Sequence, residues 1–136
     1  MLLADTGVCY GATDSDDPRH ADCAGVLDAH TGELLIPVPV VVETAWLIEA
    51  RLGPAAEAGF LRAVNTGELE RVDLLAEDWA RVAELIDTYN DLGLGLVDAS
   101  VIAVSERLGI TQVATLDHRH FRVVRPRHVD AFDLLP

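Results

Sequence analysis

Four acidic residues each follow a short apolar run, and together they have the composition of a metal-binding site. Asp5 follows Leu-Leu-Ala, and Asp117 follows Val-Ala-Thr-Leu. Glu43 comes after Val-Pro-Val-Val-Val, and Asp98 comes after Leu-Gly-Leu-Val. Carboxylates held close together raise one another's pKa and cannot all stay ionised without a compensating charge. Because ligand sets made only of oxygen favour hard cations, the pattern indicates Mg²⁺, with Mn²⁺ as a substitute, and not Zn²⁺.

Taken singly, each acid also has an ordinary structural interpretation. Asp5 and Asp98 suit the N-cap of a helix, and Glu43 suits the positive end of a helix. Asp117 suits the start of a turn. Only the set of four, brought to one place, indicates metal chemistry.

Three hydroxyl side chains stand one or two positions from these acids, namely Thr6, Ser100 and Thr115. They are candidates to donate hydrogen bonds to the carboxylates or to metal-bound water. Capping and strand positions are an equally good interpretation of all three residues.

The apolar periodicity predicts short strands that alternate with helices. Strands are expected over residues 2–4, 34–36, 68–74 and 112–116, with one or two more between 121 and 135. Helices are expected over residues 18–30, 39–52, 55–65, 76–90 and 98–108. This alternation is typical of an α/β fold with a mainly parallel central sheet flanked by helices. Ligands of such sheets bind beyond the carboxyl ends of the strands, where the four acids are expected to meet.

Composition limits the class of protein. The chain has 136 residues, 50% of them hydrophobic, which is enough for one domain (1–136) with a core of its own. Acids outnumber basic residues by 23 to 10, every basic residue being Arg, and the net charge is −13. No apolar stretch is long enough for a membrane span, and no basic leader precedes Asp5. Cys9 and Cys23 are expected to be reduced and buried, so a cytoplasmic protein is predicted.

The basic residues are unevenly distributed. Residues 118–128 contain four Arg and three His and no acid. Arg119, Arg122 and Arg125 are candidates for contacts with the phosphates of a nucleic acid, and a solvated strip paired with local carboxylates is the alternative. His118 and His120 could bind a metal with Asp117, although a solvated or phosphate-facing pair is the favoured interpretation.

The acidic motifs, taken in order, resemble those of PIN-domain ribonucleases, and most of all the VapC toxins of bacterial VapBC toxin–antitoxin pairs. The segments that carry the resemblance are Leu-Leu-Ala-Asp5-Thr-Gly, Pro-Val-Val-Val-Glu43, Gly-Leu-Val-Asp98-Ala-Ser and Ala-Thr-Leu-Asp117, with the basic tail after it. The resemblance spans essentially the whole chain and implies a PIN-like three-layer fold. It also implies a Mg²⁺-dependent endoribonuclease, often dimeric, that a VapB antitoxin holds inactive.

The resemblance assigns roles to the four acids. Asp5 and Asp98 are the expected direct metal ligands, and Glu43 and Asp117 would act partly through water. The metal would lower the pKa of a bound water for in-line attack on an RNA phosphodiester, and nearby Arg would stabilise the charge that develops on the phosphoryl oxygens. Single-stranded or looped RNA is the expected target.

Two other functions remain open at this point. One is a PIN-type nuclease that acts on DNA, although the short chain lacks the inserted helices of a flap enzyme. The other is a non-catalytic α/β interaction module, in which the acids are caps and the Arg strip binds a partner protein. The loss of activity on replacing Asp5 or Asp98 would separate catalysis from mere binding.

Overall fold

One parallel sheet runs through the computed structural model, which describes residues 1–136. Its strands are β1 (Leu2–Ala4), β2 (Leu34–Pro37), β3 (Glu70–Val72), β4 (Gln112–Ala114) and β5 (Asp133–Leu135). They lie in the order β3-β2-β1-β4-β5, and every neighbouring pair is parallel. The chain therefore extends the sheet first to one side of β1 and later to the other, and the crevice expected of such a reversal lies at the ends of β1 and β4.

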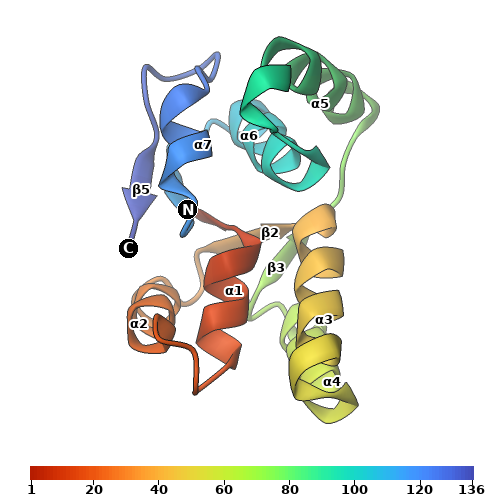
Figure 1. The fold of residues 1–136 in the computed structure, drawn as a ribbon, viewed down its shortest axis with the longest axis vertical. Helices are drawn as coiled ribbons and strands as arrows, with labels where there is room; N and C mark the ends of the chain where they lie inside the picture. The colour runs from red at the N-terminus through yellow and green to blue at the C-terminus, as the bar shows by residue number, and fades with distance from the viewer.

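Helices cover both faces of this sheet (Figure 1). One group comprises α1 (Thr6–Thr13), α2 (His20–Ala29), α3 (Val38–Leu52) and α4 (Pro54–Thr66). The opposite group comprises α5 (Ala76–Thr88), the short 3₁₀ helix η1 (Asn90–Leu92), α6 (Leu96–Leu108) and α7 (His118–Val123). The predicted three-layer α/β architecture with a parallel central sheet is confirmed, and the sheet is parallel throughout.

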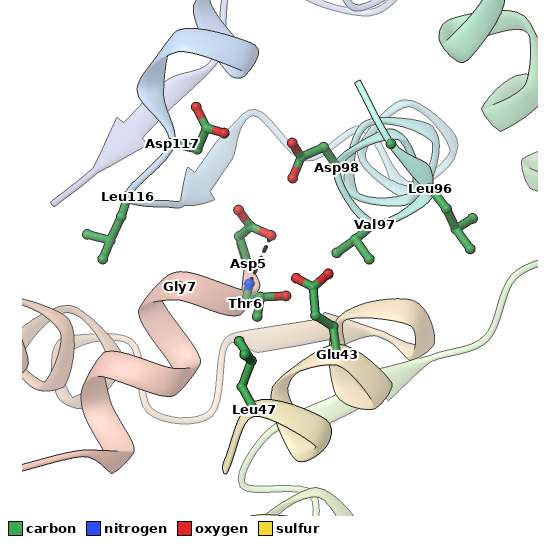
Figure 2. Close-up of a pocket in the computed structure, with 11 residues that line it drawn as sticks. Asp5, Thr6, Gly7, Glu43, Leu47, Leu96, Val97, Asp98, Leu116 and Asp117 are labelled. Atoms are coloured by element: carbon green, nitrogen blue, oxygen red, sulfur yellow. Dashed lines mark hydrogen bonds between the residues drawn. The ribbon is translucent and has the colours of Figure 1, made fainter. Parts of the chain in front are cut away.

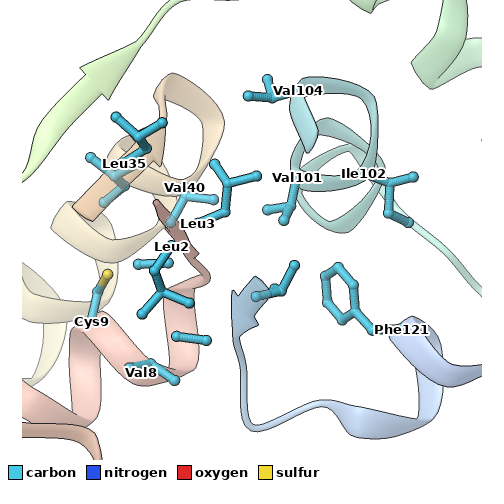
Figure 3. Close-up of a cluster of buried hydrophobic side chains, with 14 of the residues drawn as sticks. Leu2, Leu3, Val8, Cys9, Leu35, Val40, Val101, Ile102, Val104 and Phe121 are labelled. Atoms are coloured by element: carbon cyan, nitrogen blue, oxygen red, sulfur yellow. The ribbon is translucent and has the colours of Figure 1, made fainter. Parts of the chain in front are cut away.

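The core lies where β1 meets the helices on either side (Figure 3). Leu2, Leu3 and Val101 are fully buried, and Phe121 of α7 packs edge-on against Phe132 at 6.0 Å. Because the sheet is buried on both faces, the central strands are continuously apolar and do not alternate apolar with polar residues. A sheet held in this way gives rigid attachment points for side chains at the strand ends.

Two helices differ from the sequence-based expectation. The helix α1 was not predicted, because two of its eight residues are glycine, which has low helix propensity. The helix α7 occupies part of the tail for which only strands were expected, and of those strands β5 alone forms. Both helices are held by tertiary packing: the side chains of Val8 and Phe121 are no more than 1% exposed.

Several element boundaries also differ from the predicted ones, and three of these differences bear on the site or the sheet. The strand β3 spans only Glu70–Val72, since the flanking residues of this edge strand have no partner beyond it, and β4 ends at Ala114 and not at residue 116. The helix α6 begins at Leu96 with Gly95 as its N-cap, so Asp98 lies in the first turn and the expectation that it caps the helix is wrong.

Neither cysteine forms a disulfide. Cys9 and Cys23 are free and buried, and burial raises the pKa of the Cys9 thiol far above its usual range. A thiol that stays protonated is a core residue and not a nucleophile. None of the helices is both long and apolar enough to cross a lipid bilayer.

Candidate metal centre

The four predicted acids meet at one cavity at the carboxyl edge of the sheet (Figure 2). The cavity has a volume of about 650 Å³. Its lining consists of these acids and small or apolar neighbours: Asp5, Thr6, Gly7, Glu43, Leu47, Gly95, Leu96, Val97, Asp98, Leu116 and Asp117. Four different elements contribute one carboxylate each, so the gathering of charge is a property of the tertiary structure.

Asp5 is the most deeply buried of the four carboxylates, with 5% of the residue exposed. It directly follows β1 and caps α1, where the backbone N–H of Thr6 donates to Oδ1 at 2.8 Å. The Thr115 hydroxyl donates to Oδ2 at 2.9 Å. Burial raises the pKa of the Asp5 carboxyl to about 7, and the charge of Asp98 adds to this effect. The ionised form of Asp5 is therefore disfavoured unless a positive charge lies close to it.

Asp98 and Asp117 face each other across the imidazole of His120. The Nδ1 atom of His120 lies 2.6 Å from Oδ2 of Asp98 and 3.0 Å from Oδ2 of Asp117. Burial raises the pKa of Asp98, while the hydrogen bond with His120 acts against that rise. The same hydrogen bond raises the pKa of His120. These three side chains offer ligand atoms that all lie within 4.8 Å of one another.

Glu43 reaches the cavity from the second turn of α3 and is the exposed member of the set. Its charge contributes to the raised pKa values of both Asp5 and Asp98, which places it within electrostatic range of each. Pro39 at the start of α3 fixes the entry of the helix without loss of a hydrogen bond. The N-termini of α1 and α6 bring partial positive charge to Asp5 and Asp98 and offset part of the repulsion.

Of the three predicted hydroxyl residues, Thr115 and Thr6 lie at the carboxylates. The Thr115 hydroxyl donates to Asp5 and accepts from the backbone N–H of Asp117 at 3.0 Å, so it connects two of the acids. The buried Thr6 hydroxyl lines the cavity and has no hydrogen-bond partner. Ser100 instead donates to the carbonyl of Val97 at 2.6 Å and lies outside the cavity lining.

The basic strip divides into paired and unpaired residues. Arg127 forms an ion pair with Glu84 at 2.8 Å. No carboxylate lies within 4.0 Å of the guanidinium groups of Arg119, Arg122 or Arg125, all of which are exposed. The alternative in which local carboxylates pair with this strip therefore holds only for Arg127. The helix α7, which carries Arg119 and Arg122, has the cavity residue Asp117 as its N-cap.

The environment predicted for His120 from the sequence is wrong. A solvated or phosphate-facing imidazole was favoured, yet its side chain is only 17% exposed and contacts two of the acids. The sequence feature that indicates this contact is the spacing of three residues between Asp117 and His120, because such a spacing places both side chains on one face of a helix. The sequence alone allowed a shared metal site with Asp117 but did not favour it, because residues 118–123 were not predicted to be helical.

The residues of the cavity fit a divalent cation. Four carboxylates supply hard oxygen ligands and surplus negative charge. The buried and unpartnered Thr6 hydroxyl is a polar atom that lacks an interaction within the protein, and such atoms are normally satisfied by water or a ligand. The chemistry of these residues therefore suits a bound divalent cation.

Residues 2–126 match the family model of the PIN domain. The chain belongs to the PIN-domain family. Ribonuclease VapC26 of Mycobacterium tuberculosis is 28% identical to this PIN protein over 135 residues, which cover 99% of this chain and all of the relative.

Solved structures of similar fold include two toxin–antitoxin proteins. VapC20 of Mycobacterium tuberculosis, described as a toxin that cleaves the sarcin-ricin loop, superposes with a TM-score of 0.75 at 20% identity over 83% of this chain and 87% of that chain. A DNA-bound VapBC from Salmonella typhimurium gives a TM-score of 0.71 at 17% identity over 98% and 96% of the two chains. At this level of identity the likeness concerns the fold of the PIN domain.

Proposed function

We propose that residues 1–136 act as one PIN domain with the activity of a Mg²⁺-dependent endoribonuclease toxin, and that a VapB-type antitoxin neutralises it. The observation that carries this proposal is the convergence of four carboxylates, from four separate elements, on one cavity. The full-length similarity to a named ribonuclease supports RNA as the substrate class. Because the substrate is RNA, the proposed site of action is the cytoplasm.

In this proposal Asp5 and Asp98 are direct metal ligands, and Glu43 and Asp117 act partly through water. A divalent cation bound there supplies Lewis-acid polarisation of a phosphoryl oxygen and lowers the pKa of water that attacks the phosphodiester. Thr115 orients Asp5 and the backbone at Asp117 through the two hydrogen bonds of its hydroxyl. Mn²⁺ is expected to substitute for Mg²⁺.

The unpaired arginines supply the proposed contacts with the RNA backbone. Arg119, Arg122 and Arg125 are exposed and free of carboxylate partners, so their charge is available to phosphates. The net charge of the protein is −13, which by itself would repel RNA. The three arginines offset this negative charge at their own part of the surface. Binding of RNA is therefore expected to depend on both the metal and this strip.

An apolar groove beside the cavity is the proposed contact with a second copy of the chain. It is lined by Val38, Pro39, Val42, Glu43, Trp46, Trp79, Leu96 and Val97, and the side chains of Trp46 and Trp79 are 63% and 53% exposed. Large exposed aromatic residues in one patch are typical of protein interfaces. Sedimentation of the isolated chain tests this point: a dimer that Trp46→Arg dissociates is expected, and a monomer at all concentrations contradicts it.

The catalytic proposal is tested by replacing the two expected direct ligands. Asp5→Asn and Asp98→Asn should each abolish RNA cleavage and growth arrest while the circular dichroism spectrum is unchanged. Glu49→Gln removes a charge from an exposed position of α3 and is the matched control, which should keep full activity. Cleavage at the parent rate by either Asn variant would show that these acids are not the catalytic ones.

Substrate assays separate the remaining functions. The unmutated protein, freed of antitoxin and supplied with Mg²⁺ or Mn²⁺, should cleave single-stranded RNA and leave single-stranded and flap DNA intact. Cleavage of DNA in preference to RNA would favour the DNA nuclease. If no nucleic acid is cleaved, the non-catalytic interaction module is the better account.

A further inference from the structure

His120 belongs to the tightest group of ligand atoms in the protein. Only Asp98, Asp117 and His120 offer three metal-ligating atoms within 4.8 Å of one another. Asp5 and Glu43 line the same cavity but do not belong to this group. The part of the site that needs least rearrangement to bind an ion therefore contains one nitrogen and two carboxylates.

The spacing of these atoms agrees with adjacent positions in a coordination shell. Around an octahedral ion with metal–ligand distances of about 2.1 Å, neighbouring ligand atoms lie about 3 Å apart. Nδ1 of His120 lies 2.6 Å and 3.0 Å from the two carboxylate oxygens. Small movements of the side chains would place an ion among the three.

The imidazole presents one particular nitrogen to the acids. It is Nδ1 of His120 that faces the carboxylates of both Asp98 and Asp117. A cation held by these two carboxylates would therefore meet Nδ1 of the ring and not Nε2.

The position of the ring is held by the core. The next residue, Phe121, is 1% exposed and packs against Phe132, so α7 cannot turn freely. Across the cavity, the buried Thr6 hydroxyl is without a partner, which independently indicates that the space between the elements normally holds a polar ligand such as a hydrated ion.

We infer that His120 is a direct metal ligand through Nδ1, and that it makes the site a mixed nitrogen–oxygen site that prefers a first-row transition-metal ion such as Mn²⁺ to Mg²⁺. This inference rests on the proposed function, in which the surrounding carboxylates hold a divalent cation, and it concerns only the relative affinity of the site for Mn²⁺ and Mg²⁺, both of which that function accepts. Mg²⁺ binds oxygen almost exclusively, whereas imidazole is a normal ligand of transition metals. The single imidazole thus shifts the ion preference of a site that is otherwise all oxygen.

The first test is spectroscopic and needs no variant. The full-length protein is loaded with Mn²⁺ and examined by electron spin echo envelope modulation, which detects ¹⁴N bound directly to the ion. The modulation of a coordinated imidazole is expected, and it should vanish in His120→Gln and persist in His118→Asn. Bound Mn²⁺ without ¹⁴N modulation overturns the inference and leaves the proposed function intact.

The second test separates a ligand from a residue that merely positions Asp98. His120→Gln keeps an amide N–H that can donate to Asp98 but loses the imidazole nitrogen. By isothermal titration calorimetry its affinity for Mn²⁺ should fall at least about tenfold, the usual effect of disturbing a metal site. The affinity for Mg²⁺ should change by less than about threefold, and His118→Asn should change neither.

Two outcomes contradict the inference in different ways. An unchanged ratio of Mn²⁺ to Mg²⁺ affinity in His120→Gln assigns His120 a positioning role only. Failure of the unmutated protein to bind any divalent ion contradicts the proposed function itself, and this inference with it. Circular dichroism melts of both variants exclude unfolding as the cause.

Discussion

At the scale of single residues, the cavity concentrates charge that the fold does not neutralise by itself. Asp5 illustrates this, since its carboxylate accepts two hydrogen bonds and its pKa is nevertheless raised to about 7. Burial outweighs the hydrogen bonds, because taking a charged group out of water is costly. Without a nearby cation, ionised Asp5 is therefore expected to destabilise the folded protein, as is common for buried groups at functional sites.

The raised pKa of Asp5 leads to a prediction about pH. A carboxyl whose pKa is higher in the folded than in the unfolded protein binds its proton more tightly when folded, so the stability it contributes is present below about pH 4 and is lost as pH rises through 7. Fully ionised, Asp5 lowers the free energy of unfolding by roughly 4 kcal/mol. In EDTA, Asp5→Asn should melt at a higher temperature than the parent at pH 8, and the difference should shrink toward pH 5.

Metal should reverse this difference. Addition of Mn²⁺ or Mg²⁺ at pH 8 is expected to raise the melting temperature of the parent and to have a smaller effect on Asp5→Asn, since ligands stabilise only the state that binds them. A melting difference between parent and variant that does not change from pH 5 to pH 8 would contradict the account of Asp5.

A second prediction concerns the hydroxyl that connects two acids. Thr115→Val keeps the shape of the side chain but removes the donor to Asp5 and the acceptor for the Asp117 N–H. We expect a loss of about 1–3 kcal/mol in unfolding free energy, from the unsatisfied buried groups, and metal affinity about 10–100-fold weaker. Chemical denaturation and calorimetry measure the two effects.

Ser100→Ala is the matched control for Thr115→Val. Ser100 is buried too, but its hydroxyl donates to the Val97 carbonyl and not to an acid. This substitution should lower stability by about 1 kcal/mol and leave metal affinity unchanged. Equal effects of the two substitutions on metal binding would remove Thr115 from the site.

At the scale of elements, the site depends on helices that local sequence does not favour. The helix α1 contains Gly7 and Gly11, yet it forms because it packs closely on its neighbours. A Cβ atom at Gly11 would lie 2.7 Å from Sγ of Cys23 in α2. The absence of a side chain there permits the close approach of α1 and α2.

Two glycine substitutions with opposite outcomes test this packing. Gly11→Ala should destabilise the protein by about 1–3 kcal/mol, because it overpacks the contact with Cys23. Gly25→Ala, on the exposed side of α2 with no atom within 4 Å of the new Cβ, should stabilise it by roughly 0.5–1 kcal/mol through helix propensity. Urea denaturation of both variants provides the comparison, and stabilisation by Gly11→Ala would refute the proposed contact.

At the scale of the whole molecule, the proposed binding of RNA depends on how charge is distributed over the surface. The chain carries −13 overall, and five acids outside the cavity are occupied in ion pairs with arginine. The arginines of α7 are left unpaired beside the acidic cavity. We therefore expect a polyanion to be attracted at the rim of the site, once a cation has reduced the negative charge within it.

RNA affinity should accordingly depend on metal and salt. We expect tighter binding with Ca²⁺ than with EDTA, and a salt dependence whose slope decreases by about one for each of Arg119→Ala and Arg122→Ala. Arg62→Ala, which removes an exposed and unpaired arginine from α4, is the control and should leave the slope unchanged. Equal affinities in Ca²⁺ and EDTA would contradict binding bridged by metal.

The sequence by itself determined most of the sheet, five of the seven α-helices and the positions of the four acids. A continuous apolar run indicates a strand that is buried on both faces, and apolar residues at helical spacing indicate a helix that is buried on one face. These elements could therefore be predicted from the local pattern of the sequence. The acids could be placed on one rim because strands of a parallel sheet end on the same side.

Tertiary structure alone decided the remaining features. The helices α1 and α7 gain their stability from packing between distant segments, which propensity does not record. Thr115 and Asp5 are separated by 110 residues and still share a hydrogen bond, and His120 meets Asp98 only because α7 docks against α6. Contacts of this kind depend on how whole elements pack, and no local pattern encodes that.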